Sequence, residues 1–440
     1  MVAFYIFYQM KSIRDRLEAL YSKAEQQPAE PVAESAIRRD LDRLFQPKPG
    51  EKFFPKSQLE QKAQSISDLV NGTWINTHFG DIFRAEFEYS LDEPYGNLLL
   101  SEILPFSAET YTEIFQIPNI HQAEELIFID TETTGLSGGT GTIAFLVGLG
   151  FIQDRQFVVY QYFITQLSHE EGLLELLQQV IPNYKCLVTY NGKTFDIPIL
   201  NARFVLNRLP PLPEDMPQID LLHPTRTIWK YALENCKLKT IETDRLQLYR
   251  EDDIPGELIP DVYFDYLRNR RIDQIERIFY HNRFDVITML ANLILVIKSY
   301  QTTEPEDNPL TDYAKARLFT RKKDIERSIS HYQNVLHSQI SASRRQKTYL
   351  ELAALYKKLE RYDEALHYWQ AAIHPDQPFN LEPYIEQAKY FEHKLKDFTQ
   401  AIGIVEQALN SLPLYRSTES NLLIQRLNRL NLKLAHHNRH

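Results

Sequence analysis

The chain has 440 residues, of which 43% are hydrophobic and 25% charged, and this globular composition is long enough for two or three domains. A formal net charge of −10 argues against non-specific coating of nucleic acid by the whole surface, although a local basic groove stays open. The two cysteines, Cys186 and Cys236, lack the C-x-x-C spacing and are too few for a disulfide framework. We therefore expect a cytoplasmic protein without structural zinc.

The beginning of the chain carries no predicted leader or anchor. No stretch approaches the roughly twenty apolar residues of a membrane helix, so we expect no membrane partner. Residues 1–9 are apolar over only about half that length and no basic region precedes them, which argues against a secretion signal. Met10 opens a plausible helix start, which raises the hypothesis that residues 1–9 are not present in the native protein.

Residues 1–119 are expected to form an N-terminal helical and linking region. A helix-like segment at residues 11–24 leads into a polar tract that contains Pro28 and Pro31. From Gly72 the alternation of apolar and polar residues predicts additional strands. These strands either extend the sheet of the next domain or form a small cap on it, and no chemistry is assigned to them.

The segment LIFIDTETTGL, residues 126–136, ends a hydrophobic run in two acids. The run predicts a strand that is buried on both faces. Because side chains alternate along a strand, Asp130 and Glu132 should leave one face and Thr131 the other. Two adjacent carboxylates raise each other's pKa unless a cation neutralises them, so the pair suits hard divalent ions. On this segment alone, a strand that simply runs out into a polar turn is an equally open alternative.

Residues 120–300 are expected to form an α/β domain with a mixed sheet. Three consecutive strands should form an antiparallel meander, and a crossover helix with a capping box at Ser168 and Glu171 should lead to a short buried strand. The expected strands after the first lie at residues 143–152, 156–164 and 186–190, and the later helices at residues 195–207 and 272–299.

Two further acids follow in places where the first pair could use them. Asp196 comes after the buried strand in YNGKTFDIPIL, and Asp285 lies in the long final helix in YHNRFDVITM. An acid beside the buried face of a helix should be paired or liganded. His281 is four residues before Asp285, so both side chains should lie on one side of the helix, a turn apart.

FIDTETTGL, YNGKTFDIP and the unit of His281 and Asp285 together resemble the three motifs of the DEDD (DnaQ-like) exonucleases, which have a ribonuclease H-like fold. In that family four acids hold two Mg²⁺ or Mn²⁺ ions, and a histidine or tyrosine activates the water that attacks the terminal phosphodiester at the 3′ end. The resemblance implies four metal ligands in this chain, with Glu132 also helping to position the water: Asp130, Glu132, Asp196 and Asp285.

The general base departs from the family pattern. The histidine class places its base five residues before the last acid and the tyrosine class four, but here Tyr280 and His281 occupy these positions in the opposite order. We assign His281 as the catalytic base, because imidazole accepts a proton at physiological pH whereas tyrosine titrates near pH ~10. A buried core histidine is the alternative.

Four side chains near the acids are expected to contact the nucleic acid. Thr131 and Leu136 match family positions that touch the terminal nucleotide, Phe195 could stack on a terminal base, and Asn191 could hydrogen-bond the substrate. Core packing for Phe195 and strand capping for Asn191 are the alternatives. Four cations either line a phosphate-binding groove or form ordinary solvated surface: Arg226, Lys230, Lys237 and Lys239.

Residues 310–440 are expected to be all helical. Segments that begin at Ser328, Ala365 and Ala401 occupy equivalent places 37 and 36 residues apart, near the tetratricopeptide length of about 34. We therefore expect tetratricopeptide-like repeats that bind a protein partner or orient the substrate. This region combined with the three motifs and with DLLHPTRTIWKYALENCKLKTIE, residues 220–242, is similar to the bacterial YprB-like proteins.

The sequence thus predicts a cytoplasmic, metal-dependent nuclease, specifically a 3′ to 5′ exonuclease that uses two Mg²⁺ or Mn²⁺ ions on a single-stranded end of DNA or RNA. A nucleic-acid-binding scaffold without catalysis is one alternative. A structure-specific endonuclease is another, because ribonuclease H-like folds support both kinds of cut.

Overall fold

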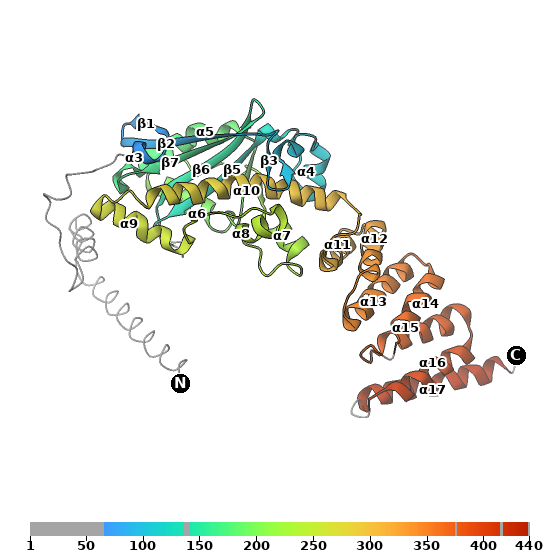
Figure 1. Ribbon diagram of the computed structural model, residues 1–440. Helices are drawn as coiled ribbons and strands as arrows, with labels where there is room; N and C mark the ends of the chain where they lie inside the picture. The colour runs from blue at the N-terminus through green and yellow to red at the C-terminus, as the bar shows by residue number, and fades with distance from the viewer. Residues whose placement is uncertain (1–65, 136–140, 375, 414–416, 439–440) are drawn as a thin grey trace, which may run out of the picture. The chain divides into compact units, whose positions relative to one another are not determined.

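The computed structural model describes residues 66–135, 141–374, 376–413 and 417–438 (Figure 1). These residues belong to one compact unit, Gln64–His440. The helix expected at residues 11–24, the question about residues 1–9 and the substrate contact expected at Leu136 all lie outside the described residues.

A seven-stranded mixed sheet lies at the centre of the first part, in the order β1-β2-β7-β6-β5-β8-β9. The strands β5, β6 and β7 form the expected antiparallel meander, whereas β8 and β9 continue the sheet in parallel. Because β2 pairs with β7, strands that precede residue 120 extend this sheet. The strands are β1 (Gly72–Thr77), β2 (Gly80–Ser90), β5 (Leu126–Thr133), β6 (Ala144–Gln153), β7 (Gln156–Ile164), β8 (Cys186–Thr189) and β9 (Gln218–Asp220), with β3 (Pro94–Tyr95) and β4 (Leu98–Leu99) in a separate pair.

Helices cover both faces of the sheet, which is why its central strands are apolar on both sides. The helices of this part are α3 (Ile66–Leu69), α4 (Ala108–Phe115), α5 (Glu170–Val180), α6 (Asp196–Leu206), α7 (Leu222–Trp229), α8 (Leu238–Ile241), α9 (Ile259–Asn269) and α10 (Ile275–Gln301). Ile127 and Ile129 of β5 pack with residues of α5 and α6, whereas Leu126 and Phe128 pack with the second half of α10. The alternation along β5 thus assigns each side chain to one of two cores.

The start of α5 differs from the expected capping box. The helix begins at Glu170, and no side chain caps its first turn. Ser168 lies instead in a short 3₁₀ turn, Leu167–His169, that precedes the helix. Glu170 is buried and accepts two hydrogen bonds, both 2.5 Å long, from the guanidinium of Arg203 on α6. This ion pair joins α5 to α6.

The 27-residue helix α10 runs across the sheet (Figure 1) and packs on β5, β6 and β7. Among the described residues, α10 alone is long and apolar enough to cross a membrane, by length and composition only. From the sequence we had expected no stretch of this kind. The most apolar window of α10 is 72% buried inside the protein. Packing against the sheet therefore accounts for its apolar character, as for other core helices.

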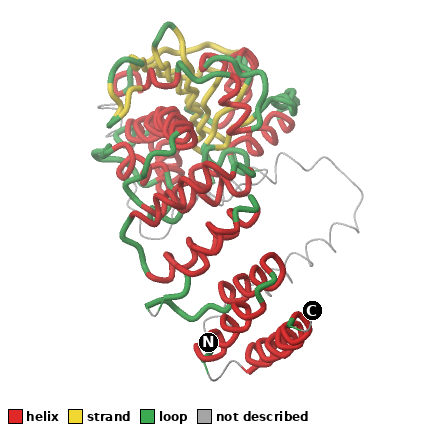
Figure 2. The backbone as a smooth tube through the Cα atoms, turned by 90° about the vertical axis from the view of Figure 1, so that its right-hand side faces the viewer, coloured by secondary structure: helices red, strands yellow, loops and turns green. Residues whose placement is uncertain are grey.

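From Pro309 onward the described chain consists of helices and loops (Figure 2), in agreement with the predicted helical domain. The helices are α11 (Pro309–Lys322), α12 (Ile325–His337), α13 (Ala342–Lys358), α14 (Tyr362–Ala371), α15 (Glu382–Tyr390), α16 (Phe398–Ser411) and α17 (Ser417–His437). α12, α14 and α16 begin 37 and 36 residues apart, at Ile325, Tyr362 and Phe398. Asp324 and Asp397 cap the first and last of these three helices in the same way, each accepting from the backbone N–H three residues later.

Candidate active site

β5 delivers Asp130 and Glu132 to the face of the sheet that α10 covers. They continue the alternation of Leu126 and Phe128, so they leave the strand toward α10. The Thr131 side chain points toward α6 instead, where its hydroxyl donates a hydrogen bond to Asp196. The strand itself continues through Thr133, so both acids lie within β5 and not in a turn that follows it.

Asp130 is held by a neutral partner on α10. Asn282 Nδ2 donates to Asp130 Oδ2 over 2.7 Å, and Gln161 Nε2 of β7 donates to Asn282 Oδ1 over 2.7 Å. A Cβ atom on Gly148 of β6 would lie 2.3 Å from Asn282 Oδ1, so glycine at this position lets α10 approach the sheet. Burial, and then the negative charges of neighbouring acids led by Asp285, raise the pKa of Asp130 well above its ordinary value.

Asp196 is the first residue of α6 and follows the turn at residues 191–195. Burial raises the pKa of its carboxyl to about 6, although the hydrogen bond from Thr131 acts in the opposite direction. Asp220, at the end of β9, holds this turn by accepting backbone N–H groups of Asn191 (2.8 Å) and Lys193 (3.2 Å). Asp220 also accepts the N–H of Leu222 over 3.0 Å, so one buried carboxylate organises the approach to Asp196.

The sequence had not indicated Asp220, the last residue of the short strand β9, as a site residue. Asp220→Ala would leave its N–H partners unsatisfied, so we expect the free energy of unfolding in urea to fall by about 1–3 kcal/mol. Asp215→Ala, on the exposed loop before β9, should change it by less than about 0.5 kcal/mol. Equal stability of the two variants would show that Asp220 does not hold the turn.

α10 carries His281 and Asp285, whose Nε2 and Oδ2 atoms are 3.7 Å apart. The other ring nitrogen of His281, Nδ1, lies 2.8 Å from Asp253 Oδ1. Burial alone would lower the pKa of His281, but the charge of Asp285 and the hydrogen bond to Asp253 raise it to about 9. The ring of Tyr280 packs against Phe284, with ring centroids 4.5 Å apart. His281 thus contacts two acids, whereas Tyr280 packs against an aromatic ring.

Glu132 is the fourth carboxylate of the set. Burial, opposed by the charge of His281 and reinforced by Asp285 and Asp196, raises its pKa to about 8. Three neighbouring acids with raised pKa values form the kind of electrostatic arrangement that is common at functional sites.

The raised pKa values predict how stability depends on pH when divalent ions are chelated. The folded protein binds more protons than the unfolded chain, because the pKa values rise from 4.5 to about 8 for Glu132, from 3.8 to about 6 for Asp196 and from 6.5 to about 9 for His281. The stability that these groups contribute is fully present below their pKa values in the unfolded chain. It is lost as the pH rises through their pKa values in the folded protein. We expect the Tm in EDTA to fall between pH 5 and pH 9, and Glu132→Gln to flatten that fall. A Tm that rises over this range would contradict the electrostatics described.

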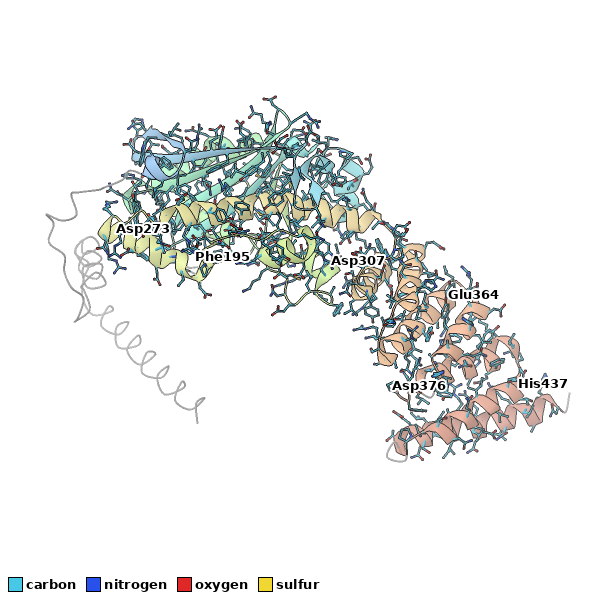
Figure 3. The ribbon with its side chains drawn as sticks, in the orientation of Figure 1. Phe195, Asp273, Asp307, Glu364, Asp376 and His437 are labelled. Carbon is cyan, nitrogen blue, oxygen red and sulfur yellow. The ribbon has the colours of Figure 1, made fainter. Side chains whose placement is uncertain are left out.

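The side chains predicted to contact substrate lie on different parts of this site. Phe195, labelled in Figure 3, is half-buried immediately before α6, and Asn191 is exposed with a left-handed φ of 67°. Thr131 is buried and bonded to Asp196. Lys239 lies beside the acids, with Nζ 3.7 Å from Asp253 Oδ2, while the other three cations are exposed along the same segment: Arg226, Lys230 and Lys237.

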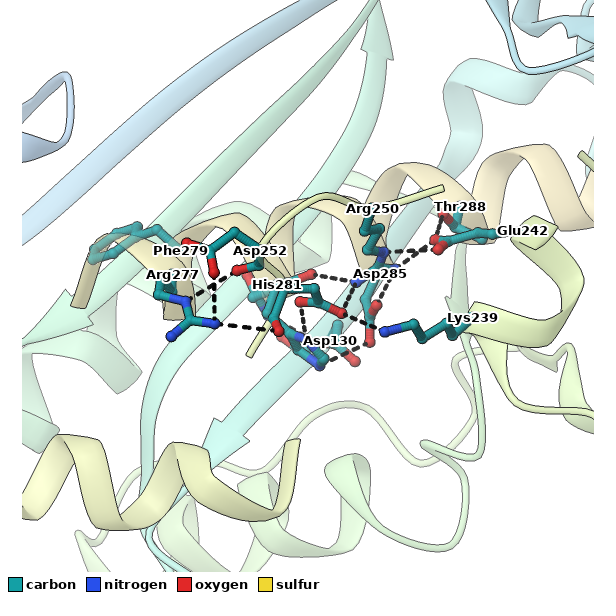
Figure 4. A network of polar contacts seen from close by, with 12 residues as sticks. Asp130, Lys239, Glu242, Arg250, Asp252, Arg277, Phe279, His281, Asp285 and Thr288 are labelled. Atoms are coloured by element: carbon teal, nitrogen blue, oxygen red, sulfur yellow. Dashed lines mark hydrogen bonds and ion pairs between the residues drawn. The ribbon is translucent and has the colours of Figure 1, made fainter. Parts of the chain in front are cut away.

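Sequence reasoning missed two charged residues that touch the third motif. Asp253 bonds to His281, and Arg250 forms an ion pair with Asp285 (Figure 4). They come from an irregular segment 28 and 35 residues earlier in the chain. A loop without periodicity carries no local signal that would have identified them.

The four carboxylates fit Mg²⁺ or Mn²⁺ in the kind of ligand atom they offer and in charge, because both ions prefer carboxylate oxygens. Among the described residues, however, no group of three or more histidine, cysteine, aspartate or glutamate side chains is arranged so that it could hold a metal ion as it stands. Asp196 is engaged by Thr131, and Asp285 by Arg250. Binding an ion therefore requires side-chain adjustment at this site.

Comparisons with known proteins agree with this fold. Residues 127–295 match the model of the RNase_H superfamily. The chain is 32% identical over 320 residues to YprB of Bacillus subtilis (strain 168). The aligned region covers 72% of this chain and 76% of YprB. Among solved structures, it is similar to the family B DNA polymerase of the hyperthermophilic archaeon Pyrobaculum calidifontis at a TM-score of 0.31 and 12% identity. That match covers 70% of this chain but only 46% of the polymerase.

Proposed function

Because the chain belongs to the YprB family and carries a nuclease domain of the ribonuclease H superfamily, we propose that it is a 3′ to 5′ exonuclease of the DEDD class. The observation that supports this proposal most directly is the convergence of three separate motifs. β5, the start of α6 and the middle of α10 bring four carboxylates and one imidazole close enough together to influence one another's charge. Chance matches to three motifs would not be expected to interact electrostatically in this way.

In this proposal four carboxylates hold the metal: Asp130, Glu132, Asp196 and Asp285. Two divalent ions bound there would supply an activated water and stabilise the leaving oxygen. His281 accepts the proton of the attacking water at Nε2, because Nδ1 is occupied by Asp253. Asp253 thus fixes both the ring orientation and the nitrogen that faces the site.

The substrate that we propose is a single-stranded 3′ end of DNA or RNA. Asn191 and Phe195 flank the turn that leads to Asp196, where a terminal nucleotide would be bound and a base could stack on the aromatic ring. Lys239 is exposed beside the acids and can contact a phosphate.

We further propose that residues 120–300 act as the catalytic domain and residues 310–440 as tetratricopeptide-like repeats. The starts of α12, α14 and α16, at intervals of 37 and 36 residues, support a repeated helical hairpin. Such arrays present extended surfaces, so this region is suited to bind a protein partner or to orient the nucleic acid.

The test is to incubate 5′-labelled single-stranded DNA and RNA with the protein in Mg²⁺, in Mn²⁺ or in EDTA. A ladder of products that shortens from the 3′ end only with metal supports the exonuclease. Internal cuts would instead identify an endonuclease, and binding without any metal-dependent product would identify a scaffold.

A further inference from the structure

Three buried charged side chains contact α10, and two of them, Glu242 and Arg250, have no part in the proposed reaction. Glu242 begins a π-helical turn, Glu242–Leu246, and Arg250 and Asp253 follow it in an irregular segment. Their side chains are only 1%, 3% and 4% exposed. Burying charged groups is costly unless they are paired, so a buried group of this kind beside an acidic site calls for an explanation.

Arg250 connects Glu242 to the last carboxylate of the site. Its Nε and Nη2 atoms donate to the two oxygens of Glu242 over 2.7 and 2.5 Å. Nη2 also donates to Asp285 Oδ1 over 2.5 Å, and Nη1 to the carbonyl of His281 over 3.3 Å. One guanidinium therefore contacts both residues of the third motif, as Figure 4 shows.

Glu242, which holds the Arg250 guanidinium, is itself held by a hydrogen bond. The Thr288 hydroxyl donates to Glu242, and the same hydroxyl is 2.9 Å from the hydroxyl of Tyr95. A planar guanidinium bound at both oxygens of a carboxylate has a defined orientation, which the single point charge of lysine cannot reproduce. Arg250 is thus held in place independently of Asp285.

We propose that Arg250 is a positioning residue that orients Asp285 and thereby sets the affinity of the site for divalent ions. Because Arg250 holds Oδ1, Oδ2 is the oxygen left to face the site, where it lies 3.7 Å from His281 Nε2. A ligand whose orientation is fixed loses less conformational freedom when it binds an ion. The inference rests on the proposed function, since it concerns the ions of the nuclease.

Electrostatics alone gives the opposite expectation. A fixed positive charge repels a divalent ion, so its removal would tighten binding if charge dominated over orientation. Removal of an outer partner that orients a metal ligand typically costs about 10- to 100-fold in metal affinity. The direction of the change in affinity therefore distinguishes the two roles.

The test measures Mn²⁺ binding by isothermal titration calorimetry on the full chain and three variants. Glu242→Gln combined with Arg250→Met removes both members of the buried pair, which keeps the net charge and avoids leaving one of them unpaired. Arg250→Lys keeps the positive charge but cannot donate to both oxygens of Glu242 in the way that a planar guanidinium does. Arg277→Gln is the control, because the Arg277 guanidinium pairs with the exposed carboxylate of Asp252, 3.1 Å away, and contacts Asp253 only at its backbone carbonyl.

We expect the double variant to bind Mn²⁺ about 10-fold or more weakly, Arg250→Lys to lie between it and the parent, and Arg277→Gln to change by less than about twofold. The kcat of the double variant should recover at high Mn²⁺, while its KM for the oligonucleotide stays near that of the parent. Thermal melts of each variant verify that it is folded.

Equal or tighter Mn²⁺ binding by a folded double variant, or by folded Arg250→Lys, overturns the inference. A parent protein that binds no Mn²⁺ contradicts the proposed function itself, and with it this inference.

Discussion

Asp130→Asn is expected to lower kcat for metal-dependent cleavage by about 10³-fold or more, a loss of about 4 kcal/mol of transition-state stabilisation. The amide keeps the shape of the side chain and can still accept the hydrogen bond from Asn282, but it no longer offers a charged ligand. Because burial and neighbouring acids raise the pKa of Asp130, removal of its charge should also raise the Tm in EDTA at pH 8. Activity and stability should therefore change in opposite directions.

The matched control is Asp252→Asn, which alters an acid of the same region whose side chain is 84% exposed. It should leave kcat within about twofold and Tm nearly unchanged. Single-turnover cleavage of a 5′-labelled oligonucleotide and a thermal melt in EDTA provide the two measurements. Full activity in Asp130→Asn would refute the assignment of the site, and a lower Tm would refute the account of its buried charge.

The sheet was predictable because its strands carry strong local patterns. β7 has the expected bounds, β6 begins and ends one residue later than expected, and β8 ends one residue earlier. The alternation of β5 was enough to place Asp130 and Glu132 on one face and Thr131 on the other. The alternation did not show that the opposite face of β5 also contributes to the candidate site, through the hydrogen bond from Thr131 to Asp196.

The polar residues behind the site could not be predicted, because their partners are distant in the chain. Asp220 reaches back 29 and 27 residues to the backbone of Asn191 and Lys193. Arg250 reaches forward 35 residues to Asp285. Contacts of this kind depend on how β9 and the segment after α8 are packed, and no periodicity or short motif encodes that packing.

The protonation state of His281 also follows only from tertiary structure. The sequence suggested a near-neutral imidazole, but Asp285 and Asp253 raise its pKa to about 9 against the effect of burial. A protonated imidazole cannot accept a proton, so in the proposed mechanism His281 can act as the base only when divalent ions neutralise the surrounding acids. Metal binding and the availability of the base are therefore expected to be linked.

His281→Ala is expected to lower kcat by about 10²-fold or more and to abolish the rise of kcat with pH that a general base produces. In the parent protein with saturating Mn²⁺, kcat should increase with pH until His281 is neutral. Asp253→Asn removes a hydrogen bond that raises the pKa of His281, so this rise should move to lower pH. The measurement is the single-turnover rate between pH 5.5 and pH ~9.5, a range chosen to bracket the ordinary and raised pKa of histidine.

Tyr280→Phe is the control for the neighbouring candidate base. Its ring packs against Phe284, and the loss of one hydroxyl should leave both the rate and its pH dependence unchanged. An unaltered pH profile in His281→Ala together with a large loss in Tyr280→Phe would transfer the role to Tyr280. If instead Asp253→Asn shifts the profile and Tyr280→Phe does not, His281 is the base and its hydrogen bond with Asp253 sets its basicity.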